Sequence, residues 1–467
     1  MNTIKTKDLT KIGYTDNVAR SIATTAVNRH CKHRNRQDVL AELADVMRNP
    51  ANYAGNEVWG RLSEHFCPQV EQPEFTTFRL RSEPLPYKNY GGKDVEHLAI
   101  QQMNLAMSLP VAMQGALMPD AHAGYGLPVG GVLAVENAII PYAVGVDIGC
   151  SMSLTLFRES PQHLQRYAHQ AKEALKKWTH FGMEGGLDVR QEHEVLERSE
   201  FREIPLLKPL HGKAVRQLGT SGGGNHFVEF GDMQLFAGNV LGLPEGAYMA
   251  LLSHSGSRGL GAEIARHYSV IARERCKLPR QAQHFAWLNM ASAEGEEYWK
   301  CMNLAGDYAK ACHERIHANL TKEMELHVIA NVNHNHNFAW KETLPDGREA
   351  IVIRKGATPA HYGEAGIIPG NMTTAGYLVC GRGVPDALYS ASHGAGRAMS
   401  RKEARESFTW SALNKMLASA GVTLIGGSIE EAPPAYKDVE HVMEAQASLV
   451  EVHGRFMPRI VRMNDEQ

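Results

Sequence analysis

The stretch Pro141-Tyr-Ala-Val-Gly-Val-Asp-Ile-Gly-Cys150 places a carboxylate and a thiol close together, beside two glycines. An apolar run that ends in glycine predicts a buried strand followed by a tight turn. Such a turn aims the side chains of Asp147 and Cys150 at one point, where they can bind a metal ion. The two residues also fit ordinary roles, because a cysteine often packs as a small apolar side chain and a turn aspartate often bonds its own backbone.

Downstream histidines lie in polar segments rich in glycine, serine or asparagine, unlike histidines that pack in a core. They are His226, His254, His336 and His393. Short apolar runs such as Phe227–Phe230 and Met249–Leu252 adjoin them, so each histidine is expected at the end of a strand. Strand ends bring loops together and often form sites, so these side chains are candidates to join Asp147 and Cys150.

Further segments carry candidate polar groups. Asp120 and His122 alternate along an extended segment, where the carboxylate either orients a histidine or satisfies turn backbone. The segment Ser390–Arg401 predicts a loop that runs into a helix N-terminus, which would set His393 beside backbone donors. The glycine-rich segment Gly219–Glu229 offers free N–H groups suited to phosphate, without the Lys-Ser/Thr of a P-loop.

The composition excludes a uniformly basic nucleic-acid-binding surface. The chain has 467 residues with a formal charge of −2, and its 43 glycines suit a backbone that approaches ligands closely. A phosphate partner therefore needs a local basic patch. Candidates for it, which equally fit solvated surface charge, are Arg354, Lys355, Arg382, Arg397, Arg401, Lys402 and Arg405.

The seven cysteines are an odd number without regular spacing, which indicates free thiols in a reducing compartment rather than a disulfide framework. The N-terminal Met-Asn-Thr-Ile-Lys-Thr-Lys-Asp lacks the apolar region of a secretion signal. No uncharged run approaches membrane-spanning length. These features together predict a cytoplasmic protein without a membrane segment.

Apolar residues recur at helical spacing from Asp16 to Met47. This pattern predicts a helical extension over residues 1–75, followed by a larger domain over residues 76–467. Within the extension, His30-Cys-Lys-His33 has the look of a metal-binding tract. No second Cys/His pair follows at zinc-finger spacing, so a solvated basic helix end is expected there.

The larger domain mixes helical and strand patterns. Ser160 and Pro161 predict the start of an amphipathic helix, residues 291–324 show the longest helical pattern, and a further helix is expected near residues 439–452. Strand-like runs precede and follow these helices, as at residues 326–330. Helices and strands are therefore both expected in this domain.

Taken in order, these motifs resemble those of the RtcB-type RNA ligases, the GTP-dependent RNA-splicing ligases. The resemblance covers roughly residues 85 to 455 and implies an α+β fold of the RtcB type, with mixed sheets around a central metal and nucleotide cleft. It makes residues 76–467 the catalytic domain. The segments that carry it are Met118-Pro-Asp-Ala-His-Ala-Gly-Tyr-Gly, Gly145-Val-Asp-Ile-Gly-Cys150, Gly224-Asn-His-Phe-Val-Glu229, Ser253-His-Ser-Gly-Ser-Arg-Gly259, His336-Asn337, Arg354-Lys-Gly-Ala-Thr-Pro359, Ser392-His-Gly-Ala-Gly-Arg397 and Ala435-Tyr-Lys-Asp438.

The resemblance implies an enzyme that joins an RNA 3′-phosphate or 2′,3′-cyclic phosphate end to a 5′-hydroxyl end, with GTP and two manganese ions. His393 would take GMP, Asp120 would orient it, and Arg397 would lie near the transferred group. The implied metal ligands are Asp147, Cys150, His226, His254 and His336, with the thiolate shared between the ions. The implied nucleotide-binding residues are Asn225, Glu229, Tyr436, Gly394, Ala395 and Gly396. Manganese follows from the resemblance alone, because the ligand types suit zinc, iron or cobalt at least as well.

The chain departs from the family pattern at the metal turn and at its end. Gly149 and Ser151 stand where the family usually has Asn and Gly, and Asn464 stands near the lysine of a terminal Val-Lys-Gly, with Arg462 as the closest cation. Loss of that lysine predicts weaker or less selective use of GTP. An activating protein partner is also possible in this reading.

Two other functions fit the same motifs. The first is a metal-dependent RNA-end phosphoesterase that has lost the nucleotide-transfer step, and the second is an RNA-end-binding protein without turnover. Product analysis separates the phosphoesterase from a ligase, because it would leave 3′-phosphate ends and no joined strand. The intact set of histidines argues against a binding protein, which needs no nucleophile.

Overall fold

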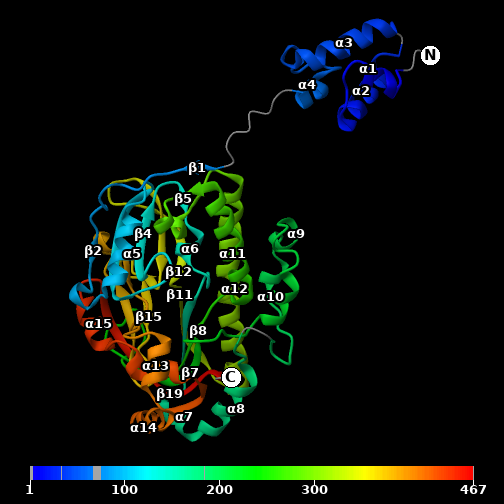
Figure 1. The fold of residues 1–467 in the computed structure, drawn as a ribbon. Coiled ribbons are helices and arrows are strands. Elements are labelled where there is room, and N and C mark those ends of the chain that lie inside the picture. Colours follow the sequence, from blue (N-terminus) through cyan, green and yellow to red (C-terminus); the bar gives the residue numbers. More distant parts are fainter. Residues whose placement is uncertain (1–3, 33, 67–74, 183–184, 466–467) are drawn as a thin grey trace. The chain divides into compact units, whose positions relative to one another are not determined.

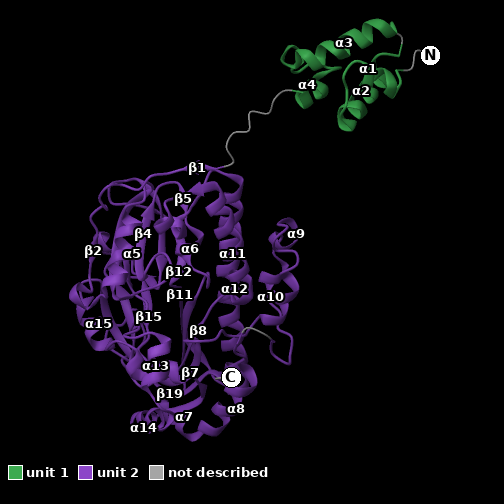
Figure 2. Cartoon of the chain, in the orientation of Figure 1, with its two compact units in different colours: residues 1–74 green, residues 75–467 purple. Residues whose placement is uncertain are grey.

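The computed structural model describes residues 4–32, 34–66, 75–182 and 185–465. The chain divides into two compact units, residues 1–74 and residues 75–467 (Figure 2). The helices of the first unit are α1 (Thr6–Lys11), α2 (Asn17–His30), α3 (Arg36–Arg48) and α4 (Gly60–Phe66). Asp16 caps α2, because its carboxylate accepts hydrogen bonds from the backbone N–H groups of Val18 and Ala19.

The first unit has an apolar core of its own, built around Leu9, Leu43 and Leu62. The helical pattern predicted for this part of the chain is confirmed. In the predicted basic tract, His30 ends α2, whereas His33 lies outside the described residues.

The larger sheet of the second unit has the strand order β11-β6-β8-β7-β19-β16-β15, with β18 beside β19. Its neighbouring strands are antiparallel except β18 and β19, which are parallel. The strands are β6 (Ser151–Phe157), β7 (Phe227–Leu235), β8 (Gly246–Ser255), β11 (Val328–Asn335), β15 (Ala365–Ile368), β16 (Gly376–Gly381), β18 (Thr423–Gly427) and β19 (Val450–Asp465).

The smaller sheet has the order β12-β13-β4-β3-β2 and is also mixed, because β2 and β3 are parallel. Its strands are β2 (Lys88–Asn89), β3 (Ala112–His122), β4 (Val129–Val135), β12 (Asn337–Thr343) and β13 (Glu349–Lys355). The short pairs are β1 (Thr76–Thr77) with β9 (Cys276–Lys277), β5 (Ala138–Ile139) with β10 (Leu288–Asn289), and β14 (Ala357–Pro359) with β17 (Ser390–Ser392). The two sheets meet at residue His336, which links β11 to β12.

Helices cover the sheets of the second unit. Figure 1 shows α11 (Arg258–Arg275) beside the long helix α12 (Ala293–Glu323), and α12 packs on β6, β8 and β11. The other helices are α5 (His97–Met107), α6 (Pro141–Val144), α7 (Pro161–Arg166), α8 (Ala168–Trp178), α9 (Glu200–Glu203), α10 (His211–Gln217), α13 (Arg401–Ser407), α14 (Trp410–Ala420) and α15 (Val439–Ala445). The predicted α+β class with mixed sheets is confirmed, as are the helices after Ser160 and over residues 291–324.

Local predictions were wrong at two places near the site. The run after Pro141 forms the short helix α6 rather than a strand, because proline is favoured in the first helical turn and Gly145, with φ of 103°, ends it. Helix α13 begins only at Arg401, capped by Ser400, so His393 follows strand β17 and is not at a helix N-terminus.

The C-terminal part was also predicted incorrectly. The helix expected near residues 439–452 ends at Ala445, and β19 then runs from Val450 to Asp465 through the larger sheet. Short apolar runs do not distinguish a buried strand from a buried helix by periodicity alone, which explains the error. None of the helices in the described part of the chain has both the length and the apolar composition needed to cross a lipid bilayer.

The separate core of the first unit generates a stability prediction. Replacing Leu43 by Ala, which deletes a fully buried side chain, is expected to destabilise this unit by about 2–5 kcal/mol. Calorimetry should show the unfolding transition of the first unit at a lower temperature, with the transition of the second unit unchanged. The matched variant Leu133→Ala, in the core of the second unit, should do the reverse. A shift of both transitions by Leu43→Ala would contradict independent cores.

Candidate metal and nucleotide site

The ends of neighbouring strands bring predicted metal ligands together. Cys150 precedes β6 and His226 precedes β7. His254 is the penultimate residue of β8, and His336 follows β11. These strands are antiparallel neighbours, so these four ends meet at one edge of the larger sheet. Asp147 reaches the same place from the turn between α6 and β6.

The donor atoms of these residues are close to one another. The Sγ atom of Cys150 lies 3.3 Å from Nε2 of His226 and 3.1 Å from Nε2 of His254. Nε2 of His254 is 3.2 Å from Nε2 of His336, and Nε2 of His226 is 3.1 Å from a carboxylate oxygen of Asp147. They form two overlapping groups of three, within 4.8 Å in each, and Cys150 belongs to both. The thiol is thus in a position to bridge two ions.

The glycine that departs from the family pattern is required by the local packing. Gly149 has φ of 72°, and a Cβ atom there would lie 2.8 Å from the Cα of Gly306 in α12. The close approach also lets the N–H of Gly149 donate to the carbonyl of Asn337, at 2.8 Å. The tight turn places Asp147 and Cys150 on the same side.

The donor set fits divalent transition-metal ions, for which thiolate and imidazole are suitable ligands. The Nδ1 atom of His254 is 3.1 Å from the carbonyl of Asn225, so a proton on Nδ1 leaves the lone pair of Nε2 facing Cys150. Burial and the nearby Asp147 carboxylate raise the pKa of Cys150 well above its usual value, and burial lowers the pKa of His336. A buried thiol of this kind ionises when a cation compensates its charge, which a divalent ion does.

His393 and Asp120 form the second part of the site. Nδ1 of His393 lies 2.7 Å from a carboxylate oxygen of Asp120, and the backbone N–H of His393 donates to the same oxygen at 3.2 Å. Asp120 is fully buried, whereas the side chain of His393 is 15% exposed. The buried carboxylate therefore fixes the orientation of the imidazole ring. Its ring centre is 5.0 Å from that of His336, so this pair adjoins the cluster of metal ligands.

One cavity of about 460 Å³ connects these groups, a size typical of small-ligand sites. With the exception of Asp120, which lies behind His393, all the site residues predicted from the sequence line it. The lining includes Asp147, Cys150, His226, His254, His336, Asn225, Glu229, Tyr436, His393, Gly394, Ala395, Gly396 and Arg397. Glu229 is buried in its wall, and burial raises the pKa of this carboxyl to about 8.

A buried carboxylate that the sequence analysis did not single out lies in the wall of the cavity, beside Arg397 and Tyr436. Glu431 accepts a hydrogen bond from Arg397 at 3.2 Å and another from the hydroxyl of Tyr436. The guanidinium of Arg397 also lies over the ring of Tyr436, 5.3 Å from its centre. Only the acidic pair Glu430-Glu431 beside prolines hinted at this role, because Arg397 lies 34 residues earlier in the chain.

The basic patch is smaller than the sequence suggested. Lys355, Arg397 and Arg401 line the cavity. Arg354 is instead completely buried and pairs with Glu342 at 2.6 Å, so it is a structural residue. Of the other candidates, Arg405 pairs with Glu430, Arg382 with Glu451 and Lys402 with Glu406, and these three do not line the cavity.

The C-terminal strand contributes apolar side chains to the cavity rather than a cation. Val461 and Met463 line it, whereas Arg462 and Asn464 do not. The guanidinium of Arg462 donates to the carboxylate of Asp465 at 3.0 and 3.1 Å and packs over Phe181. Arg462 is thus already engaged elsewhere.

The shared position of Cys150 predicts the effect of its removal. Cys150→Ser is expected to weaken metal binding by more than about ten-fold, because a neutral hydroxyl does not replace a thiolate. Removing a residue that only hydrogen-bonds to a metal ligand already weakens metal binding by about ten-fold or more. The measurement is metal content per chain after dialysis, followed by calorimetric titration with Mn²⁺ and Co²⁺. Cys380→Ser, at a partly exposed thiol outside the cavity, is the matched control and should bind as the parent chain does. Equal binding by both variants would exclude Cys150 as a ligand.

Comparisons with known proteins agree with this geometry. A family model described as tRNA-splicing ligase RtcB matches residues 101–207 and 206–464. The RNA-splicing ligase RtcB of Escherichia coli K12 is 30% identical over 406 residues, which cover 80% of this chain and 96% of the relative. The RNA-splicing ligase RtcB of Mycobacterium tuberculosis is 30% identical over 432 residues, which cover 77% of this chain and 99% of the relative. The tRNA-splicing ligase RtcB of Nanoarchaeum equitans is 28% identical over 430 residues, which cover 77% of this chain and 90% of the relative. On the extent of these matches, the chain belongs to the RtcB family.

Proposed function

We propose that this chain is a GTP-dependent RNA ligase that joins RNA 3′-phosphate or 2′,3′-cyclic phosphate ends to 5′-hydroxyl ends. The observation that carries the proposal is the His393–Asp120 pair, at 2.7 Å, beside a cluster of metal-ligand side chains on one cavity. An RNA-end-binding protein without turnover needs no such oriented imidazole. Family membership supports the same activity, since the relatives are named RNA-splicing or tRNA-splicing ligases.

His393 is the proposed nucleophile. The Nδ1–H group of His393 donates a hydrogen bond to the Asp120 carboxylate, so the lone pair of Nε2 is free to attack the α-phosphorus of GTP. A bond forms between Nε2 and phosphorus, the bond to the β-phosphate oxygen breaks, and pyrophosphate leaves. Because Asp120 is buried and packed, the ring keeps this orientation without a cost in ordering at the moment of reaction.

The later steps use the same cavity. Water first opens a cyclic phosphate end to a 3′-phosphate. An oxygen of that phosphate then attacks the His393-bound phosphorus, which transfers GMP to the RNA and returns the imidazole. The 5′-hydroxyl finally attacks the activated 3′-phosphate, and GMP leaves as the strands join.

Asp147, Cys150, His226, His254 and His336 are the residues that would hold two divalent ions, with manganese proposed from the family resemblance. Such ions, when bound, neutralise charge on the phosphates during in-line displacement. The proposed nucleotide contacts are Asn225, Glu229, Tyr436, Arg397 and the segment from Gly394 to Gly396, which all line the cavity.

We propose a reducing, cytoplasmic setting, supported by the free thiols of all six cysteines in the described part of the chain. RNA with the two end types above is the proposed partner, and an activating protein remains a further proposal. The first unit, which lies outside the segments matched by the family model, is proposed to contribute to RNA choice.

Replacement of the nucleophile tests the proposal directly. His393→Ala is expected to abolish covalent attachment of GMP from GTP labelled at the α-phosphate, while metal binding persists. The measurement is label retained by the denatured chain after incubation with GTP and Mn²⁺, with the adduct mapped to a peptide. His361→Ala, at a histidine outside the cavity, is the control and should label fully. Labelling of His393→Ala would refute the assignment, and a parent chain that only hydrolyses cyclic ends would favour the phosphoesterase.

The raised pKa of Glu229 generates a second test. With a pKa of about 8 the carboxyl is mostly protonated at pH 7, but an ionised carboxylate is the form that accepts the ring N–H and amino group of guanine. GTP binding at pH 7 should therefore release about one proton, and GTP affinity should increase as the pH rises toward 8.

Calorimetry in two buffers with different ionisation enthalpies measures this proton release. Glu229→Gln has no proton to lose, so its binding enthalpy should be less dependent on the buffer. A parent chain whose GTP-binding enthalpy is the same in both buffers would show that Glu229 does not ionise for the base.

A further inference from the structure

The rim of the cavity carries an aromatic and cationic group that the proposed mechanism does not use. Its members are Tyr125, Tyr142, His284 and Lys355, which are called the rim platform below. Tyr125 lies between β3 and β4, Tyr142 lies in α6, and Lys355 ends β13; these three line the cavity. His284 belongs to the 3₁₀ helix Arg280–Phe285.

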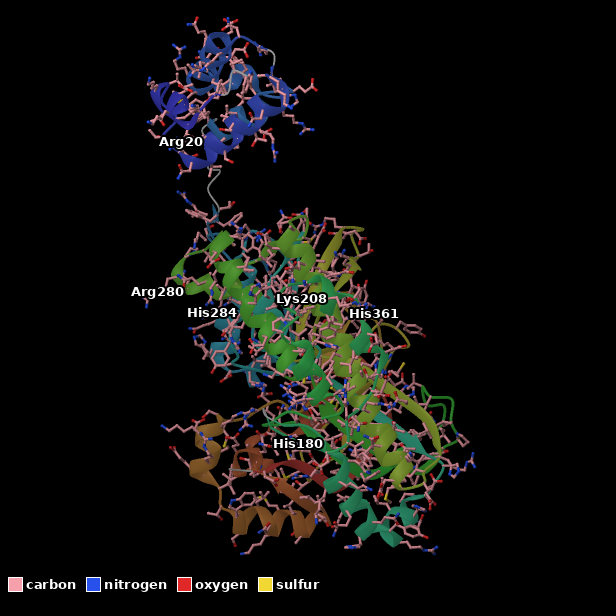
Figure 3. All side chains as sticks on the ribbon, turned by 90° about the vertical axis from the view of Figure 1, so that its right-hand side faces the viewer. Arg20, His180, Lys208, Arg280, His284 and His361 are labelled. Carbon is pink, nitrogen blue, oxygen red and sulfur yellow. The ribbon has the colours of Figure 1, made fainter. Side chains whose placement is uncertain are left out.

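The rim platform is held together by specific contacts. The rings of Tyr142 and His284 are stacked, with centres 4.7 Å apart and planes 21° apart. The ammonium of Lys355 lies 6.0 Å from the centre of the Tyr142 ring and donates to the carbonyl of Tyr125. The backbone at Gly126 packs on the same pair, since a Cβ atom there would lie 3.1 Å from a ring carbon of Tyr142. In Figure 3, His284 lies near Arg280 on one side of the second unit, away from His361.

Tyr125 is 79% exposed, although it lines the cavity. Among the described residues, it has no aromatic ring or cation packed against it. An exposed aromatic ring beside a cation is the arrangement with which proteins bind unpaired nucleotides, because bases stack on the ring and the cation attracts the phosphate. The chain as a whole has a formal charge of −2, so attraction of RNA depends on local cations such as Lys355.

Members of the rim platform also lie close in the sequence to residues of the candidate site. Tyr142 and Val146 line the cavity just before the metal ligand Asp147, and His122 lines it just before Tyr125. Gly356, which follows Lys355, also packs on His393, since a Cβ atom there would lie 3.2 Å from Cε1 of His393. A nucleotide whose phosphate reaches His393 therefore has a neighbouring nucleotide close to the rim platform. Resting on the proposed function, we propose that the rim platform stacks an unpaired base next to the reacting RNA end, with Tyr125 as the main stacking ring.

The test measures binding of short fluorescent single-stranded RNAs by anisotropy, with a 3′-phosphate or with a 5′-hydroxyl as the end under study. Each RNA is prepared with normal bases and with an abasic residue at the terminal or the penultimate position. The variants are Tyr125→Leu, which removes the ring, and Tyr125→Phe, which keeps it. Tyr362→Leu is the matched control, because Tyr362 is 90% exposed but does not line the cavity.

Tyr125→Leu should bind the RNA that uses the rim platform about ten-fold more weakly, whereas Tyr125→Phe and Tyr362→Leu should bind it as the parent chain does. The abasic residue at the stacking position should weaken binding to the parent chain and have little further effect on Tyr125→Leu. The RNA end that shows this coupling identifies which strand occupies the rim platform. Equal binding by Tyr125→Leu and the parent chain, or the same abasic effect in both, would overturn the inference.

This outcome is separate from that of the labelling experiment. If His393 is labelled but RNA binding does not depend on Tyr125, the role of the rim platform is refuted and the ligase proposal stands. If RNA binding depends on Tyr125 and on the base but His393 is not labelled, the role of the rim platform is supported and the GTP-dependent step is refuted.

Discussion

The register of four antiparallel strands is the constraint on which the site depends. Cys150, His226, His254 and His336 meet only because the ends of β6, β7, β8 and β11 lie side by side. A slip of one residue in any of these pairings would turn a ligand to the opposite face of the sheet. The thiol of Cys150, 3.1 Å from His254, is therefore positioned by the whole sheet as well as by its own turn.

The sheet is kept in this register by polar groups as well as by apolar packing. Behind the ligands, His317 of α12 bonds to Thr155 of β6 and to Ser253 of β8, each at 2.7 Å, and His313 bonds to the same serine at 2.6 Å. Burial lowers the pKa of His317 to about 3 and that of His313 to about 4, so both rings stay neutral. A satisfied network of this kind gives a unique alignment of helix and strands, because any other alignment leaves buried polar atoms unpaired.

On the side of Arg397 and Tyr436, charged groups fix the wall of the cavity in the same way. Glu431 joins Arg397 to Tyr436, and Glu430 pairs with Arg401 at 3.0 Å. These contacts hold the basic side chains in place, which lowers the ordering cost of binding the proposed phosphate ligand. The overall charge of −2 is compatible with that proposal, since a phosphate site needs only a few cations at the cavity.

The sequence alone predicted the types of the candidate ligands, their places at strand ends and the longest helix, because polar residues beside short apolar runs and the helical period are local signals. It did not determine that residues 141–144 form a helix or that Val450–Asp465 form a strand, since short apolar segments fit either structure. Three features depend on contacts that form only in the folded chain: Cys150 belongs to two groups of candidate ligands, Arg354 is buried on Glu342, and Glu431 holds Arg397. These contacts join side chains of different strands and loops, so their geometry exists only after strand register and helix packing are set.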